Sequence, residues 1–282
     1  MIPEYLIYKL TGNKVKEYTN ASTTGMLDLN TRDFSNEIIN KLGFNKILFK
    51  KLYKKSYLIG DLLPEIQKEV NGNIKVKLCS THDTASAVES INLDNYVPYI
   101  SSGTWSIFGI KLEKGINSLE ALKSNYSNEY GPDYIRFQKN IMGLWIIQNL
   151  SKELNIDFKE MINLAKKSSY CEIYDVNDEC FLSPKNMLEE IILWYKRHNK
   201  RIPNNKEDIL NATYHSLAYS YLEALDELEK ITNRKYDKIV IFGGGAKNEY
   251  LNELTKRYLN IEVISLPIEA SSIGNILNQM ED

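Results

Sequence analysis

A carboxylate stands where a strand is expected to end. Residues 74–78 alternate apolar and basic side chains, which is typical of a strand, and the polar residues 80–83 (Ser-Thr-His-Asp) follow directly. Small residues at 84–88 then begin a helical pattern predicted to run from Thr84 to Ile91. Asp83 at this point could orient a hydroxyl nucleophile, bind a metal ion or cap the helix. Taken alone, Asp83 fits a helix cap best, and His82 alone fits a hydrogen-bonded structural histidine.

A glycine-rich loop is a second stretch with chemical potential. Gly243, Gly244 and Gly245 separate a buried strand predicted at Lys238–Phe242 from a helix predicted at Asn248–Tyr258. Glycines at such a point let backbone N–H groups approach a ligand closely. The spacing is not GxGxxG and no GKS/T follows, so neither a dinucleotide fold nor a P-loop is indicated. An ordinary strand-to-helix turn explains the loop equally well.

The third stretch is a turn rich in hydroxyl groups. Ser101–Thr104 connects β-rich runs at Tyr96–Ile100 and Ser106–Leu112, which predicts a hairpin. Hydroxyl and amide groups in such a turn can surround an anion, although turn residues alone also explain the composition. The three stretches together favour phosphoryl transfer, because that reaction needs a residue to orient the nucleophile, donors around the phosphates and a nucleotide site.

The elements that must position these residues alternate between helix and strand. This pattern predicts an α/β protein with a domain boundary near residues 85–95. A polar loop is expected at Asn20–Thr24 and a further strand at Ile261–Leu266. Helices are predicted at Pro3–Leu10, Asn36–Leu42, Asn140–Leu154, Met187–His198, Lys206–Ile231 and Ala270–Met280.

Composition limits the functional class. The 282 residues are enough for two compact domains, and the formal net charge of -2 favours neither nucleic acid nor an anionic membrane as partner. Three cysteines, Cys79, Cys171 and Cys180, suggest no disulfide framework, and no metal site is predicted. The sequence shows no apolar run long enough for a membrane span and no signal peptide, so a cytoplasmic location is expected.

Several of these stretches resemble the FGGY family of carbohydrate kinases, and within it the branch acting on L-rhamnulose. The resemblance extends over nearly the whole chain, with its motifs in the family's order. They are Pro3-Glu4-Tyr5 with Leu10-Thr11-Gly12, Tyr18–Thr24, His82–Val88, Tyr99–Ser106, Lys139–Trp145, Gly243–Asn248 and Glu269–Asn275.

The resemblance implies an actin-like, ribonuclease-H-like fold with two lobes around a cleft. Residues 1–88 would form the back half of the N-terminal lobe, and residues 89–282 the nucleotide-binding C-terminal lobe. The implied activity is transfer of the γ-phosphate of ATP, with Mg²⁺, to the 1-hydroxyl of L-rhamnulose. Asp83 would be the catalytic base, with His82 and Thr84 beside it against the sugar. The implied nucleotide-binding residues are Gly103, Thr104, Asn140, Gln148, Gly243, Gly244, Gly245 and Asn248, with Asn140 and Gln148 on one face of a helix.

The chain departs from the family pattern before Asp83. The family's phosphate-binding hairpin, Asp-x-Gly-x-Ser/Thr, has no counterpart there. We therefore expect an incomplete first lobe, truncated at the N-terminus, with apolar surface exposed before residue 80. Two other functions stay open: a kinase for another ketose such as L-fuculose, and a catalytically incomplete protein that binds sugar or nucleotide. The sequence leaves the oligomeric state open.

Overall fold

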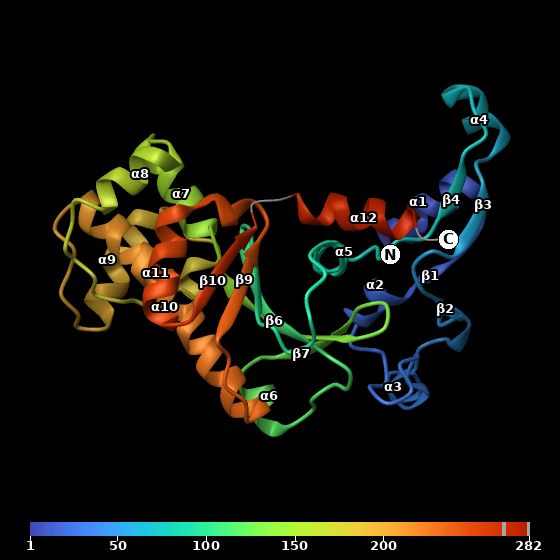
Figure 1. Ribbon diagram of the computed structural model, residues 1–282, viewed down its shortest axis with the longest axis horizontal. Coiled ribbons are helices and arrows are strands. Elements are labelled where there is room, and N and C mark those ends of the chain that lie inside the picture. The colour runs from blue at the N-terminus through green and yellow to red at the C-terminus, as the bar shows by residue number, and fades with distance from the viewer. Residues whose placement is uncertain (267–268, 281–282) are drawn as a thin grey trace.

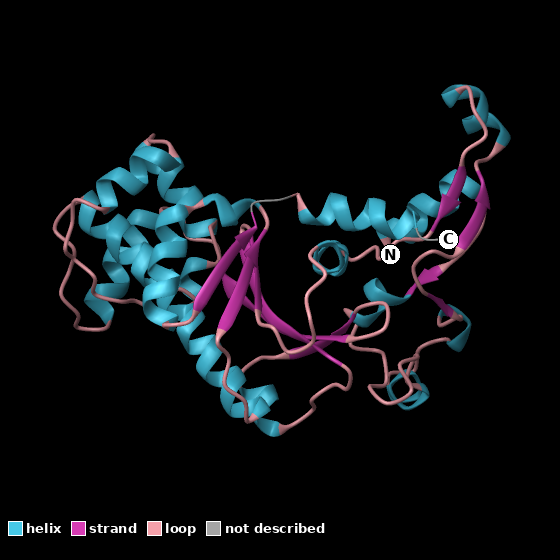
Figure 2. Ribbon diagram, viewed as in Figure 1, coloured by secondary structure: helices cyan, strands magenta, loops and turns pink. Residues whose placement is uncertain are grey.

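The protein is built around a six-stranded mixed sheet, seen in Figures 1 and 2. The computed structural model describes residues 1–266 and 269–280. The strand order is β10-β9-β5-β6-β8-β7, in which β5, β9 and β10 run parallel and the remaining pairs antiparallel. The strands are β5 (Tyr99–Ser102), β6 (Trp105–Leu112), β7 (Ser127–Tyr130), β8 (Ile135–Met142), β9 (Lys238–Phe242) and β10 (Glu262–Leu266).

Both faces of this sheet are buried. In β9, Ile239 and Ile241 belong to one apolar cluster, whereas Val240 and Phe242 belong to another. Successive strand residues point to opposite faces, so this run of apolar residues predicts a strand covered on both sides. The first cluster is the larger one and packs against helices α7 (Trp145–Leu154), α8 (Phe158–Ala165), α9 (Met187–Arg197), α10 (Lys206–Thr232) and α11 (Glu249–Leu259).

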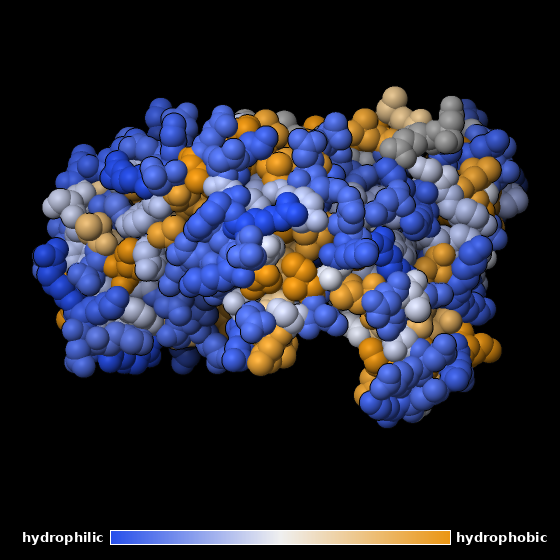
Figure 3. Space-filling model, turned by 60° about the horizontal axis from the view of Figure 1, so that its bottom comes forward, coloured by the Kyte–Doolittle hydropathy of each residue, from blue (hydrophilic) through white to orange (hydrophobic). Residues whose placement is uncertain are grey.

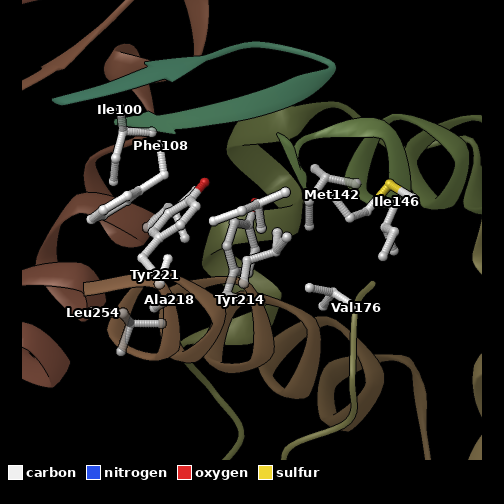
Figure 4. Close-up of a cluster of buried hydrophobic side chains, with 14 of the residues drawn as sticks. Ile100, Phe108, Met142, Ile146, Val176, Tyr214, Ala218, Tyr221 and Leu254 are labelled. Atoms are coloured by element: carbon white, nitrogen blue, oxygen red, sulfur yellow. The ribbon is translucent and has the colours of Figure 1, made fainter. Parts of the chain in front are cut away.

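The long helix α10 supplies much of that larger core. Figure 4 shows Tyr214, Ala218 and Tyr221 of α10 lying between Phe108 of β6 and the side chains of neighbouring helices. The Tyr221 hydroxyl is buried 2.7 Å from Ser106 Oγ in β6, so the polar end of this ring is paired.

Two helices cover the opposite face of the sheet. Helices α5 (Asp83–Ser90) and α12 (Ala270–Met280) pack against each other. Ala87 and Val88 from α5 and Ala270 from α12 join Tyr99 and Phe242 in the second apolar cluster. The small residues that follow Asp83 in the sequence therefore lie in a helix–sheet and helix–helix contact.

The segment before α5 has little sheet of its own. Strand β1 (Lys16–Glu17) pairs with β2 (Leu52–Tyr53), and β3 (Leu58–Asp61) pairs with β4 (Lys75–Lys77). The helices there are α1 (Ile2–Thr11), α2 (Tyr18–Ser22), α3 (Asn36–Lys41) and α4 (Pro64–Val70), and α6 (Leu119–Lys123) lies later in the chain. More than half of the exposed large apolar side chains of the described residues lie before residue 75, which confirms the expected apolar exposure. Figure 3 shows apolar patches on one face of the molecule.

Most predicted elements are confirmed within a few residues, with two corrections. The helix predicted at Asn140–Leu154 begins only at Trp145, because residues 135–142 form strand β8 between β6 and β7. The loop predicted at Asn20–Thr24 is largely helical, since Tyr18–Ser22 form α2 with Glu17 as its N-cap. Among the described residues, no helix combines the length and apolar character needed to cross a membrane.

Candidate active site

Asp83 is the first residue of α5 and points outward. Its side chain is 84% exposed, and its Oδ1 accepts a hydrogen bond of 2.6 Å from the Thr84 amide. The N-cap position is occupied by His82, whose side chain makes no cap hydrogen bond, so Asp83 is not the N-cap of α5. A carboxylate in the first turn of a helix is stabilised by the helix dipole. Asp83 therefore presents a negative charge to solvent from a fixed backbone position.

A buried carboxylate holds the loop before Asp83. Glu17 is completely buried, and its two oxygens accept hydrogen bonds of 2.7 to 3.1 Å from the backbone and hydroxyl groups of Thr19 and Thr81 and from the Asn20 amide. The Thr19 hydroxyl in turn accepts a bond of 3.3 Å from the His82 amide. Glu17 thus ties the start of α2 to the two residues that precede Asp83.

Replacing Glu17 with alanine is expected to destabilise the chain by about 3 kcal/mol, because buried amide and hydroxyl donors lose their acceptor. The midpoint of urea unfolding measures this effect. Glu69→Ala is the matched control, since Glu69 is exposed on α4, and it should change the midpoint little. Equal midpoints for the two variants would contradict the assigned role of Glu17.

The exposed face of Asp83 opens into a cavity of about 550 Å³, which we name the Asp83 pocket. The ends of β5 and β9, strands β6 to β8 and the starts of α5 and α12 form its walls. The structure brings seven of the sequence-predicted site residues to this pocket, namely His82, Asp83, Thr84, Gly103, Asn140, Gly243 and Gly244.

A second cavity, of about 800 Å³, lies next to the first and is named the Gln148 pocket. Gly103 and Gly244 line both pockets, so the two cavities meet between the β5–β6 turn and the glycine-rich loop. Four further predicted residues line only this pocket: Thr104, Gln148, Gly245 and Asn248. The apolar side chains of Leu144, Ile147, Phe158 and Ile162 form much of its wall.

The β5–β6 turn is fastened to the start of α7. The Leu144 amide donates to Gly103 O at 2.9 Å, and the Trp145 amide donates to Thr104 O at 3.0 Å. Within the turn, the Gly103 amide donates to Trp105 O at 3.0 Å, so that amide is already paired rather than directed at an anion. The Thr104 hydroxyl lies 3.4 Å from the Gln148 side chain. The Thr104 hydroxyl therefore lies on the Gln148 side, next to Gly103, where the two pockets meet.

Gly243 lets the glycine-rich loop pass close to the same turn. Its φ of 89° lies in the left-handed region, and a Cβ there would meet Ser102 O at 2.9 Å. Both features favour glycine over any other residue. The loop continues as a short 3-10 helix, Gly244–Lys247, and Asn248 caps α11 by accepting a hydrogen bond of 3.1 Å from the Leu251 amide.

Asn140 does not share a helix face with Gln148. It lies on β8 and lines the Asp83 pocket, whereas Gln148 lies on α7 and lines the other pocket. The helical prediction for residues 140–144 fails because β8 extends to Met142, where it pairs with Trp105 of β6. The structure therefore separates two residues that the sequence had placed together.

Several wall residues of the two pockets were not predicted from the sequence. Trp105 and Glu129 line the Asp83 pocket from β6 and β7, and they reach it only because these strands are neighbours of β8 in the sheet. Phe158 and Ile162 come from α8, whose N-cap Asp157 and Glu160 form the D-x-x-E pattern of a helix start. That pattern, with the four-residue spacing of Phe158 and Ile162, could have identified this wall.

Comparison with known families gives two matches along the chain. Residues 1–88 match the model of the N-terminal domain, and residues 98–280 that of the C-terminal domain, of the FGGY family of carbohydrate kinases. Two curated relatives are named rhamnulokinase. The one from Oceanobacillus iheyensis is 41% identical over 99% of this chain and 60% of its own length. The one from Bacillus subtilis is 38% identical over 99% of this chain and 59% of its own length. The chain thus spans about three fifths of these relatives.

Solved structures share the fold. A ligand-bound xylulose kinase from Lactobacillus acidophilus superimposes with a TM-score of 0.76 at 16% identity, over 99% of this chain and 57% of that one. A glycerol kinase from Plasmodium falciparum, solved with ADP, gives a TM-score of 0.71 at 17% identity, over 99% of this chain and 56% of that one. At these identities the likeness concerns the fold alone.

Proposed function

Because the chain belongs to the FGGY family of carbohydrate kinases, we propose that it carries the catalytic residues of a kinase that transfers the γ-phosphate of ATP to the 1-hydroxyl of L-rhamnulose. The products are L-rhamnulose 1-phosphate and ADP. The curated relatives named rhamnulokinase support the choice of sugar. The observation that carries the proposal is the pair of pockets joined at Gly103 and Gly244, with the exposed Asp83 in one of them.

In this proposal Asp83 orients the sugar hydroxyl. A carboxylate is too weak a base to deprotonate an alcohol before the reaction begins. In a loose phosphoryl-transfer transition state the proton leaves late, so positioning is the main contribution of the carboxylate. Thr84 fixes the direction of the Asp83 side chain through its amide, and Asn140 lines the pocket where the sugar would lie.

The Gln148 pocket is the proposed nucleotide site. Its apolar wall of Leu144, Ile147 and Ile162 suits a flat base, and Lys159 and Lys166 add positive charge at the lining. The phosphates would then pass Gly103 and Gly244 toward Asp83, because the two pockets meet there. Backbone N–H groups and a hydroxyl are suitable donors for such phosphates.

Magnesium would enter this site with ATP. The described residues hold no cluster of three or more His, Cys, Asp or Glu side chains able to bind a metal ion. The ligands of Mg²⁺ in such complexes are mainly phosphate oxygens and water, and Glu269, which lines the same pocket, is a carboxylate that could join them. When bound, Mg²⁺ neutralises charge on the phosphates.

The proposal is tested by following ADP formation with ATP, Mg²⁺ and one ketose at a time. We expect ADP formation that depends on L-rhamnulose and exceeds that with L-fuculose or D-xylulose. A higher rate with another ketose would reassign the substrate. ATP binding measured by calorimetry without turnover on any sugar would instead favour a binding protein.

The nucleotide site is tested by Ile162→Asp, which places a charge on the apolar wall of the Gln148 pocket. We expect the Kd for ATP to rise about tenfold or more. The substituted side chain offers the base no apolar contact, and its negative charge repels the phosphates. Isothermal titration calorimetry measures this change. Leu122→Asp is the control, since Leu122 is exposed on α6 and lines neither pocket, and it should leave the Kd within a factor of about two. An unchanged Kd in Ile162→Asp would place the nucleotide elsewhere.

A further inference from the structure

Two polar side chains of the Asp83 pocket have hydrogen-bonding groups left unused. Glu129 comes from β7 and Gln138 from β8, and both line the pocket. In the register of these strands Glu129 pairs with Arg136, so Gln138, two residues further along β8, projects from the same face of the sheet. The site described above gives neither side chain a role.

The guanidinium of Arg136 fixes the orientation of both side chains. It is completely buried, and its Nη2 lies 3.2 Å from Glu129 Oε2 while Nη1 lies 3.5 Å from Gln138 Oε1. A guanidinium only donates hydrogen bonds, so the oxygen of the Gln138 amide must face it. The Tyr99 hydroxyl donates to the same oxygen at 2.7 Å. One oxygen of Glu129 and the oxygen of Gln138 are therefore occupied by groups inside the protein.

The second oxygen of Glu129 lacks a donor of its own among the described residues. Oε1 lies 3.4 Å from Ser127 Oγ, but that hydroxyl has a single hydrogen and lies 3.2 Å from the main-chain oxygen of Gln138. The shorter contact takes the hydrogen, which leaves Oε1 with free lone pairs. The Glu129 side chain is 18% exposed, so a ligand in the pocket can reach its carboxylate.

The amide nitrogen of Gln138 is also unused. Among the described residues Nε2 donates no hydrogen bond, although Gln138 is only 2% exposed. Nε2 keeps some accessible surface, since the described side-chain atoms that are both enclosed and unpaired do not include it. This surface opens into the Asp83 pocket, which Gln138 lines. A buried amide without a partner costs free energy, so the site favours a ligand that supplies an acceptor there.

A free acceptor and a free donor tied to one guanidinium suit a hydroxyl group. A hydroxyl donates its hydrogen to the carboxylate and accepts from the amide, so both groups are satisfied at once. An ammonium group would leave the amide N–H groups unpaired, and a phosphate would face the negative charge of Glu129. Water makes these bonds in an empty pocket, and a sugar hydroxyl can replace it without losing them.

This pair lies apart from the hydroxyl that Asp83 orients. Glu129 Oε2 is 3.6 Å from His82 Nε2, whereas Asp83 Oδ1 is 3.8 Å from His82 Nδ1. The two carboxylates therefore approach different nitrogens of one imidazole ring, and each is placed for a different hydroxyl. In open-chain L-rhamnulose the hydroxyls other than the one on C1 are secondary and lie on C3, C4 and C5.

We propose that Glu129 Oε1 and Gln138 Nε2 together bind one secondary hydroxyl of the sugar and so help to select the substrate. Glu129 accepts the hydrogen of this hydroxyl, and Gln138 donates to its oxygen. Arg136 is a positioning residue that acts through both of them. The inference rests on the proposed function and deepens it, because it concerns how the same pocket recognises the sugar.

The test combines a variant of the protein with analogues of the sugar. Gln138→Glu keeps an oxygen facing Arg136 and Tyr99 but replaces the donor with an acceptor. Calorimetry without ATP measures the Kd of the full chain for L-rhamnulose and for its 3-deoxy, 4-deoxy and 5-deoxy analogues. We expect Gln138→Glu to raise the Kd for L-rhamnulose about tenfold to a hundredfold. One deoxy analogue should bind the parent chain with a similar loss.

That analogue distinguishes recognition from a structural effect. Parent and Gln138→Glu should bind it with Kd values within a factor of about two, because the hydroxyl that the pair holds is already missing. An equal loss of affinity for L-rhamnulose and all of its analogues would show a general disturbance of the pocket and overturn the inference. Gln279→Glu, at an exposed residue of α12, is the matched control and should leave every Kd unchanged.

Glu129→Gln tests the acceptor. Its amide oxygen would stay with Arg136, so an NH₂ group takes the place of Oε1, and the variant should single out the same analogue. Glu120→Gln, at an exposed residue of α6, is its control. A different analogue singled out by Glu129→Gln would show that the two side chains bind no common hydroxyl.

Circular dichroism reports whether each variant folds. If neither does, the parent chain must still bind one analogue at least about tenfold more weakly than L-rhamnulose, and equal affinities overturn the inference. The expected pattern of Kd values without any sugar-dependent ADP would count against the proposed function alone. Sugar-dependent ADP with affinities that neither variant alters would overturn this inference and leave the proposed function standing.

Discussion

Asp83→Asn is expected to lower the turnover number by about 10²- to 10⁴-fold, the contribution of a positioned general base. Asparagine keeps the size of the side chain and the acceptor for the Thr84 amide, but it removes the charge that orients the hydroxyl and accepts its proton. The Asp83 side chain is exposed in the pocket and packs into no core, so the fold should be unchanged. Sugar-dependent release of ADP measures the loss.

The same variant separates catalysis from nucleotide binding. Asp83 lines only one of the two pockets, so the Kd for ATP should stay within a factor of about two. Asp226→Asn, at an exposed residue of α10, is the matched control and should turn over at the parent rate. A rate for Asp83→Asn of about a tenth of the parent rate or more would remove Asp83 from the role of base.

Gly274→Ala is expected to cost about 3 kcal/mol of stability, the upper part of the range for overpacking. A Cβ on Gly274 would lie 1.7 Å from the Ser86 carbonyl oxygen and 2.5 Å from its carbon, which are backbone atoms that cannot rotate away. Helix α12 would have to separate from α5. Because α5 begins at Asp83 and the start of α12 lines the same pocket, the variant should also lose activity.

Thermal unfolding followed by circular dichroism measures the first effect. For a chain of this size the melting temperature should fall by about 6 to 12 °C. Gly72→Ala is the control, because the nearest atom to a Cβ there is 3.9 Å away, and its melting temperature should match that of the parent. A melting temperature for Gly274→Ala within about 1 °C of the parent would show that the two helices can move apart at little cost.

Local pattern was a good guide to the elements that carry one dominant signal. The strand β9 and the long helix α10 were both predicted, because a short unbroken apolar run indicates a strand buried on both faces and a long segment of 27 residues with recurring apolar positions indicates a helix. Residues 140–144 were wrongly predicted to be helical, because Ile141, Leu144 and Trp145 stand at helical spacing and so short a run leaves the start of the helix ambiguous. Pairing of β8 with β6 and β7 resolves the ambiguity, and this pairing involves residues far apart in the sequence.

Some pocket residues could likewise be predicted from the sequence and others could not. His82, Asp83 and the three glycines stand at ends of elements, where their types are conspicuous in the sequence. Glu129 and Arg136 lie within strands β7 and β8. Charged residues in strands usually face solvent, and no neighbouring residue in the sequence indicates that the guanidinium of Arg136 is completely buried. Burial of a charge depends on what covers it, and the partners of the Arg136 guanidinium, Glu129, Tyr130 and Gln138, all belong to the assembled sheet.

The sequence by itself determined the family, the order of the main helices and strands, and Asp83 as the candidate base, because each of these depends on short motifs and local periodicity. Only the tertiary structure decided which residues share a pocket: it moved Asn140 beside Asp83, left Gln148 in the neighbouring cavity and set Glu129 against His82. The physical reason is that strand order and helix packing are set by burial of apolar faces contributed by distant segments. The distances between side chains on neighbouring strands follow from that burial, so they cannot be predicted from a local sequence pattern.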